Sequence, residues 1–211
     1  MIIPSMTKNG AILTAFALAT TGAVAVVYDL TADNIAQQER NQLSTQLQEV
    51  LKPQFYDNSL YQDCALVDDP QLGKSPQIIY RARKEGKPVA LIMRHVTPRG
   101  YSGDIDLITS VFADGSIGGV RVAKHEETPG LGDKIELKKS PWITLFEGKT
   151  VLGEGDDRWA VKKDGGNFDQ FTGATITPRA VVGSVKDAVL FSQSNFNAVF
   201  NAPNACTTGD A

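Results

Sequence analysis

The feature that most constrains this chain is a long uncharged run close to its N-terminus. No charged residue lies between Lys8 and Asp29, and residues 11–27 are almost all apolar or small. As a helix, these 20 uncharged residues would extend for about 30 Å, the thickness of the hydrocarbon core of a bilayer. We therefore predict a transmembrane helix over residues 10–28, preceded by a short N-terminal segment, residues 1–9.

The charges that flank this run predict its orientation. Lys8 and the amino terminus lie at one end, and Asp29 and Asp33 lie at the other. The positive-inside rule then places residues 1–9 in the cytoplasm and the rest of the chain on the periplasmic side of the inner membrane. A cleaved signal peptide is the alternative, because Ala23-Val24-Ala25 resembles a cleavage site. Both interpretations export the rest of the chain.

Length and composition predict one globular domain besides this segment. The chain has 211 residues, of which 42% are hydrophobic and 21% charged, and this suits a single domain with a core. A net charge of -3 gives no electrostatic reason to expect nucleic-acid binding. Cys64 and Cys206 are the only cysteines; outside the cytoplasm they can form a disulfide, and the sequence leaves this open. Cys206 lies in a polar tail, residues 201–211, which we expect to be flexible.

Residues 29–52 are expected to form a stalk helix that ends before Pro53. Their apolar side chains recur at helical spacing and form a stripe that packs either on the domain or on a partner subunit. The stripe consists of Ile35, Leu43, Leu47, Val50 and Leu51.

Residues 53–200 have the pattern of one mixed domain. Short β-rich runs separated by turn signals predict an antiparallel sheet with strands at 77–82, 88–96, 104–112 and 117–123. Ser140 and Pro141 predict a capped helix to about Phe146. A further strand is expected at 159–163, and a final helix at 178–192. The predicted fold class is α+β.

The segment from Asp169 to Thr175 has local chemistry that suits a phosphate. The Thr175 hydroxyl follows two small residues, Gly173 and Ala174, and comes just before a helix predicted to begin at about Thr177, with Thr177 as its N-cap. The positive end of that helix and the Arg179 guanidinium would attract a phosphoryl group on Thr175. An ordinary loop with a helix cap is the alternative.

A second block, Glu126 to Lys134, contains a Pro-Gly turn. Gly130 and Gly132 would let the backbone approach a flat ligand, while Thr128 offers a hydrogen bond and Leu131 an apolar contact. No third glycine follows at the spacing of a dinucleotide fingerprint, which argues against a nicotinamide site. A plain turn is again the alternative.

Together, Asp-x-x-Thr-Gly-Ala-Thr at 169–175 and the block at 126–134 resemble the two signatures of the FMN-binding domain family. Its members are the G subunit of the Rnf electron-transport complex, which this chain resembles more closely, and the C subunit of the sodium-translocating NADH:quinone reductase. The resemblance implies FMN bound covalently through a phosphoester to Thr175, attached by a separate flavin transferase that uses FAD. The predicted cofactor-binding residues are Thr172, Gly173, Ala174, Arg179, Glu127, Thr128, Gly130, Leu131 and Gly132.

The implied function is an electron relay within a membrane-bound, ion-translocating oxidoreductase complex, with other membrane subunits as partners. The relay would have no catalytic residue of its own, because the cofactor performs the redox chemistry. His95 and His125 are the only histidines and belong to no compact ligand cluster, so no metal site is expected. Trp142, Trp159, Phe168 and Phe171 are predicted to be core residues, and the two phenylalanines to shield the flavin phosphate.

Two other functions remain open at this point. One is the corresponding component of the related quinone reductase. The other is a membrane-anchored binding domain in which Thr175 stays unmodified.

Overall fold

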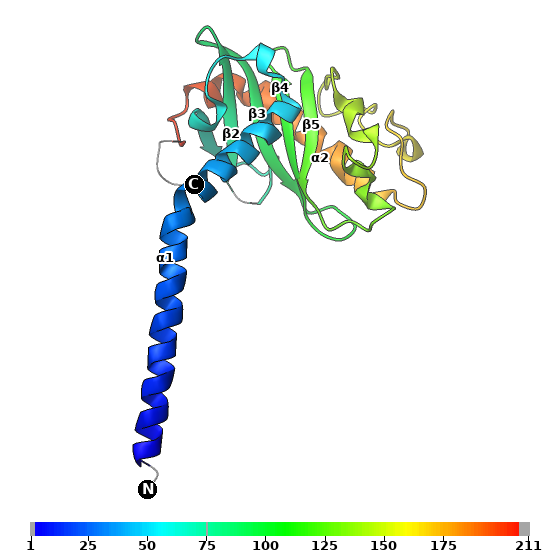
Figure 1. Cartoon of the computed structure of the whole chain (residues 1–211). Coiled ribbons are helices and arrows are strands. Elements are labelled where there is room, and N and C mark those ends of the chain that lie inside the picture. Colours follow the sequence, from blue (N-terminus) through cyan, green and yellow to red (C-terminus); the bar gives the residue numbers. More distant parts are fainter. Residues whose placement is uncertain (1–2, 75, 207–211) are drawn as a thin grey trace. The chain divides into compact units, whose positions relative to one another are not determined.

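The structure, a computed structural model, describes residues 3–74 and 76–206 of the chain (Figure 1). The chain divides into two compact units, Met1–Leu43 and Ser44–Ala211. One helix, α1 (Ile3–Val50), begins in the first unit and ends in the second. The boundary between the units therefore falls inside the segment 29–52, which was predicted to be a stalk.

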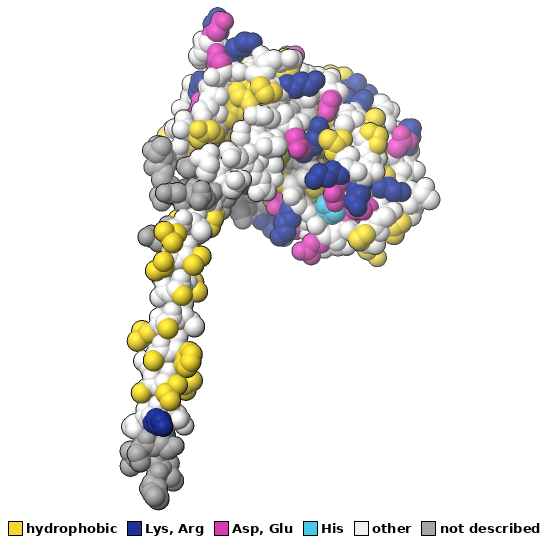
Figure 2. All heavy atoms as spheres, viewed as in Figure 1, with side chains coloured by type: hydrophobic (Ala, Val, Ile, Leu, Met, Phe, Trp, Pro, Cys, Tyr) yellow, Lys and Arg dark blue, Asp and Glu magenta, His cyan; other side chains and the backbone are white. Residues whose placement is uncertain are grey.

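The first unit contains a candidate membrane span. Residues Thr7–Ala32 are helical, have a mean hydropathy of 2.0, and are long and apolar enough to cross a bilayer. The predicted span, residues 10–28, lies inside this range. None of the described residues in the most apolar part of the span is buried, and Figure 2 shows uncharged, largely hydrophobic side chains along it. Such a surface suits contact with lipid.

The second unit is built on an antiparallel sheet of five strands in the order β1-β2-β3-β4-β5. The strands are β1 (Cys64–Val67), β2 (Gln77–Lys84), β3 (Lys87–Thr97), β4 (Ile105–Phe112) and β5 (Ile117–Lys124). The four predicted strands are confirmed to within about two residues at each end. The short edge strand β1 was not predicted, because four residues are too few to establish a period of two. The α+β class is confirmed.

Helices cover both faces of the sheet. On one face lies α2 (Ile176–Asn201), whose Val181, Val185 and Val189 are fully buried. The end of α1 lies on the other face, where Leu47 is buried and Ser110 donates a hydrogen bond to the carbonyl of Val50. Figure 1 shows the two helices on opposite sides of the strands. The stalk stripe thus packs on the domain at its C-terminal end.

The segment between β5 and α2 forms loops and short 3₁₀ helices beside β5 (Figure 1). The predicted cap is confirmed, since the Ser140 hydroxyl accepts a hydrogen bond from the amide of Trp142, although the helix Pro141–Phe146 is 3₁₀. The predicted strand at 159–163 is wrong. Only Val161 makes a bridge, to Phe168, and the 3₁₀ helix Lys162–Asp164 follows it. The chain turns back at Gly165, whose φ is 89°, so no partner strand extends the pairing.

The last helix continues to Asn201, beyond its predicted end at residue 192. The cause lies far away in the sequence: the guanidinium of Arg81 donates to the carbonyls of Val199 and Ala202 and so caps the helix.

Cys64 and Cys206 form a disulfide, and the amide of Ala205 donates to the carbonyl of Cys64. These contacts attach Ala205 and Cys206 to the domain, and the flexibility of the tail stays a prediction. Residues 207–211 lie outside the described part of the chain.

Candidate functional site

The two sequence blocks meet at one cavity of about 300 Å³. Their nearest ends are 35 positions apart in the sequence, yet both supply its walls. The loop before β4 adds a third wall. The lining residues are Tyr101, Glu127, Thr128, Leu131, Gly132, Gly173, Ala174, Thr175, Ile176 and Thr177.

The loop that carries Thr175 closes through a tight turn. The amide of Ala174 donates to the carbonyl of Phe171 at 3.0 Å, and Gly173 has a φ of 81°. A Cβ atom on Gly173 would lie 3.3 Å from Leu131 Cδ2. Glycine is therefore needed here both for its left-handed backbone and for the close approach of the two sequence blocks.

Thr175 sits at the N-terminal end of α2, which begins at Ile176. Among the described residues, its hydroxyl has no capping partner, and its side chain is half-buried at the cavity wall. The first amide groups of a helix have no partner within the helix, and they carry the positive end of its dipole. The structure thus places a free hydroxyl next to a natural binding site for an anion.

Thr177 was predicted to be the N-cap, and this is wrong by two positions. Its side chain is fully buried in the first turn, and its hydroxyl donates a short hydrogen bond to Oε2 of Glu127. Glu127 is a residue of the second block, so the bond joins the two blocks directly. The Thr177 hydroxyl thus bonds to a residue 50 positions away and does not cap the start of its own helix.

Glu127 itself is buried and links three segments. Its Oε1 accepts a hydrogen bond of 3.0 Å from the amide of Ser102, and its Oε2 accepts from Thr177. A Cβ atom on Gly100 or Gly132 would come within 2.9 Å of this carboxylate. Glu127 therefore lines the cavity, and each of its oxygens helps to hold the walls together. Its contact with a cofactor stays a prediction.

Arg179, Thr172 and Gly130 lie outside the cavity lining. The guanidinium of Arg179 forms a bidentate pair with Asp164, with distances of 2.6 Å (Nε–Oδ2) and 2.9 Å (Nη2–Oδ1). These hydrogen bonds hold the pKa of Asp164 below its ordinary value and raise that of Arg179. A contact between Arg179 and a phosphate stays a prediction, and it requires the guanidinium to leave this partner.

Sequence reasoning did not single out Tyr101. Its ring lines the cavity and is 68% exposed, although large aromatic side chains are mostly buried. It lies between Gly100 and Gly103 in the loop before β4, which the sequence marked only as a turn. The signal that could have identified it is an aromatic residue within a turn, between two glycines.

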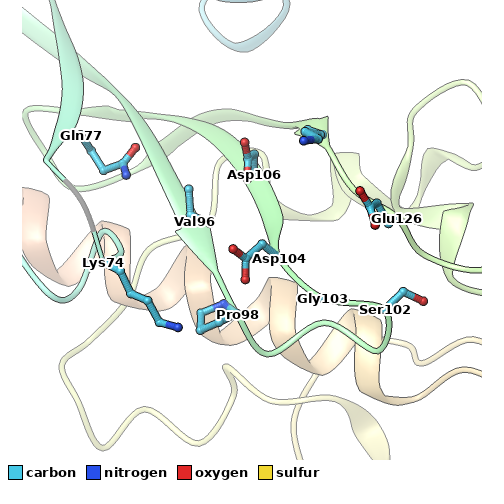
Figure 3. Close-up of a pocket in the computed structure, with 10 residues that line it drawn as sticks. Lys74, Gln77, Val96, Pro98, Ser102, Gly103, Asp104, Asp106 and Glu126 are labelled. Carbon is cyan, nitrogen blue, oxygen red and sulfur yellow. The ribbon is translucent and has the colours of Figure 1, made fainter.

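A larger cleft, of about 600 Å³, lies on the other side of the same loop (Figure 3). In Figure 3, Lys74 lies on one side of this cleft and Asp106 and Glu126 lie on the other. Ser102 and Glu126 line the cleft, whereas their neighbours Tyr101 and Glu127 line the cavity. We take the smaller cavity as the candidate functional site, because the Thr175 loop lines that cavity and not the larger cleft.

The two histidines make structural hydrogen bonds. His95 is fully buried, with Nδ1 2.8 Å from the Ser184 hydroxyl and Nε2 2.8 Å from the Thr109 hydroxyl. Burial lowers the pKa of His95 to about 3, so the ring is neutral at physiological pH. His125 pairs with Glu136 and accepts a hydrogen bond from the amide of Glu127.

The four predicted aromatic core residues are confirmed as buried. Trp142, Trp159, Phe168 and Phe171 are each at most 8% exposed. With Phe146 they form a cluster behind the Thr175 loop, with ring centroids 4.6 to 5.9 Å apart.

Comparison with known proteins covers almost the whole chain. Residues 100–190 match the family described as the FMN-binding domain, and residues 1–50 match the family described as the RnfG N-terminal region. The G subunit of the ion-translocating oxidoreductase complex of Salmonella typhi is 51% identical over 193 residues, which are 92% of this chain and 94% of that protein. The G subunit of Vibrio cholerae serotype O1 (strain ATCC 39541) is 47% identical over 206 residues, covering 97% and 99%. That of Escherichia coli O157:H7 is 48% identical over 193 residues, covering 92% and 94%.

Proposed function

The chain belongs to the family of G subunits of ion-translocating oxidoreductase complexes, and on this premise we propose that it carries FMN through a phosphoester to Thr175 and relays electrons. One observation supports the attachment most strongly. The cavity brings the second block against a hydroxyl that has no partner among the described residues, at the start of a helix. The relatives named above are all G subunits of such complexes, so the quinone reductase alternative has no separate support.

The residues of the cavity fit FMN. Leu131 and Tyr101 offer apolar surface to a flat ring, and the first turn of α2 offers amide groups to a phosphate. The one buried carboxylate on the wall, Glu127, has each of its oxygens in a hydrogen bond to another segment of the wall. When bound, FMN supplies the redox chemistry, and the chain supplies position and electrostatics.

The attachment is a group transfer from FAD, catalysed by a separate flavin transferase. Oγ1 of Thr175 attacks the phosphorus on the flavin side of the pyrophosphate. The new Oγ1–P bond forms as the P–O bond to the adenylate half breaks. AMP leaves, and the hydroxyl proton passes to a base of the transferase. The half-buried, uncapped Thr175 hydroxyl suits such a reaction because it gives up no hydrogen bond within the chain.

We also propose that the second unit faces the periplasm, with the candidate span Thr7–Ala32 in the inner membrane beside other subunits of the complex. The charge difference between Lys8 and Asp29 supports this orientation. The Cys64–Cys206 disulfide gives independent support, because disulfides persist in oxidising compartments. Protease added to spheroplasts should digest the second unit. Protection of the unit until the membrane is lysed would reverse the orientation.

The decisive experiment is a mass measurement on the peptide that contains Thr175. Peptides from the denatured chain, purified from native membranes, should carry the mass of FMN on this residue. Thr175→Ala should abolish the adduct and the yellow colour. Thr175→Ser, the matched control that retains a hydroxyl, should keep both. An unmodified wild-type peptide would leave only an anchored binding domain, and colour that survives Thr175→Ala would move the attachment elsewhere.

A further inference from the structure

The loop that would be modified has an outer polar side and an inner aromatic side. Asp169, Gln170, Thr172 and Gly173 are exposed, whereas Phe171 between them is only 8% exposed. The loop therefore presents its polar residues to solvent while one ring anchors it from behind. Gly165 and Gly166 precede the loop, and such residues give a chain much conformational freedom unless contacts restrict it.

Trp142 supplies those contacts from a different element. Its indole N–H donates a hydrogen bond of 2.7 Å to the carbonyl of Asp169, the first residue of the motif. Its ring meets Phe171 edge to face, with centroids 5.1 Å apart and planes at 70°. Trp142 is itself held by the Ser140 cap and is 6% exposed. It is not among the residues that line the cavity.

We propose that Trp142 is a positioning residue for flavin attachment, which holds the loop 169–174 in the shape that the transferase recognises. This inference rests on the proposed function and adds to it a residue outside both sequence blocks. Ordering the loop before the transferase binds lowers the entropy cost of the encounter. Without the indole donor, the transferase must order the loop itself.

Trp159 provides a matched control within the same cluster. It too is 6% exposed, and its indole N–H donates a hydrogen bond of 3.1 Å, but to the carbonyl of Thr150. Its ring packs against Phe146 and Phe168, whose centroids are 5.9 and 5.2 Å away. Trp142→Phe and Trp159→Phe thus remove the same atoms and one N–H···O=C hydrogen bond each. Only the bond lost in Trp142→Phe holds the loop 169–174.

The test uses the full chain in detergent, produced in cells that lack a flavin transferase and then supplied with purified transferase and FAD. Loss of one net hydrogen bond predicts that Trp142→Phe lowers kcat/KM for the protein substrate about five-fold, mainly through KM. Trp159→Phe should retain the wild-type value. Hydrogen exchange in the peptide 169–175 should become faster in Trp142→Phe alone, which a general loss of stability would not produce.

Equal kcat/KM values for the two tryptophan variants, or equal exchange in this peptide, would overturn the inference. If Trp142→Phe does not fold, Phe171→Leu replaces it. This change keeps an apolar side chain in place and removes the edge-to-face contact with Trp142, so kcat/KM should fall by the same factor. A wild-type kcat/KM for Phe171→Leu would refute the positioning role of Trp142. A wild-type chain that accepts no flavin would instead refute the proposed function itself.

Discussion

Replacement of Glu127 by alanine tests whether one buried carboxylate holds the cavity together. In the wild-type chain this side chain accepts hydrogen bonds from the Ser102 amide and the Thr177 hydroxyl. Glu127→Ala leaves the buried hydroxyl of Thr177, and the amide of the more exposed Ser102, without this acceptor. The loop before β4 and the first turn of α2 then lose the side chain that joins them to the second block.

The expected magnitude follows from these two bonds. A hydrogen bond to a charged group contributes about 1.5 to 3 kcal/mol. The bond from the exposed Ser102 should contribute near the lower end of this range, so Glu127→Ala should lower the free energy of unfolding by about 3 to 5 kcal/mol. For a domain of this size, the midpoint of thermal unfolding should fall by roughly 10 °C. In Glu127→Gln the amide oxygen still accepts from Ser102 and the amide nitrogen donates to Thr177. Its cost should be smaller, about 1 to 2 kcal/mol.

The assay is urea unfolding of the full chain in detergent, followed by tryptophan fluorescence, together with the fraction of chains that carry flavin. Glu126→Ala is the control, since Glu126 is the adjacent, exposed carboxylate and should change stability by less than about 0.5 kcal/mol. We expect Glu127→Ala to lose stability and flavin together, because Thr177 is two residues from Thr175, the proposed point of attachment. Equal midpoints for the Glu126 and Glu127 variants would refute the role assigned to this carboxylate.

Three further predictions concern the loop, a buried base and the disulfide. Gly173→Ala forces a side chain into a backbone with a φ of 81° and should cost about 1 to 2 kcal/mol; an unchanged thermal midpoint would contradict this strain. His95 has a folded pKa of about 3, so between pH 6.5 and 3 the unfolded state binds a proton that the folded state does not. The free energy of unfolding should therefore decrease as the pH falls through that window. His95→Gln should reduce the slope of the urea midpoint against pH, and equal slopes for the variant and the wild type would exclude His95 as the cause. Reduction of the Cys64–Cys206 disulfide should cost about 2 to 5 kcal/mol, measured as a lower thermal midpoint after thiol titration confirms two free cysteines.

Much of the sheet was predictable because its signals are local. Glu85-Gly86 between two β-rich runs predicts a tight turn, and the structure places both residues in the left-handed region, with φ values of 52° and 73°. The cap at Ser140 was predictable for the same reason, since donor and acceptor are two residues apart.

The errors arose where a distant residue decided the outcome. The last helix was predicted to end at residue 192, yet Arg81 on β2 caps carbonyls more than a hundred positions away, at the end of the longer helix. Thr177 has the side chain of an N-cap, yet it donates to Glu127. Arg179 pairs with Asp164 in the structure, and its contact with a phosphate stays a prediction.

The amino-acid sequence by itself determined the apolar segment near the N-terminus, the turns of the sheet, and the two blocks that identify the family. Each of these depends on residue types at short spacing, which act through backbone conformation and hydrophobic periodicity. Only the tertiary structure decided that the blocks share one cavity, that Glu127 joins its walls, and that Trp142 supports the motif from behind. These contacts join residues that are 27 and 50 positions apart, and no local pattern encodes them, because the packing of the whole core determines which side chains meet.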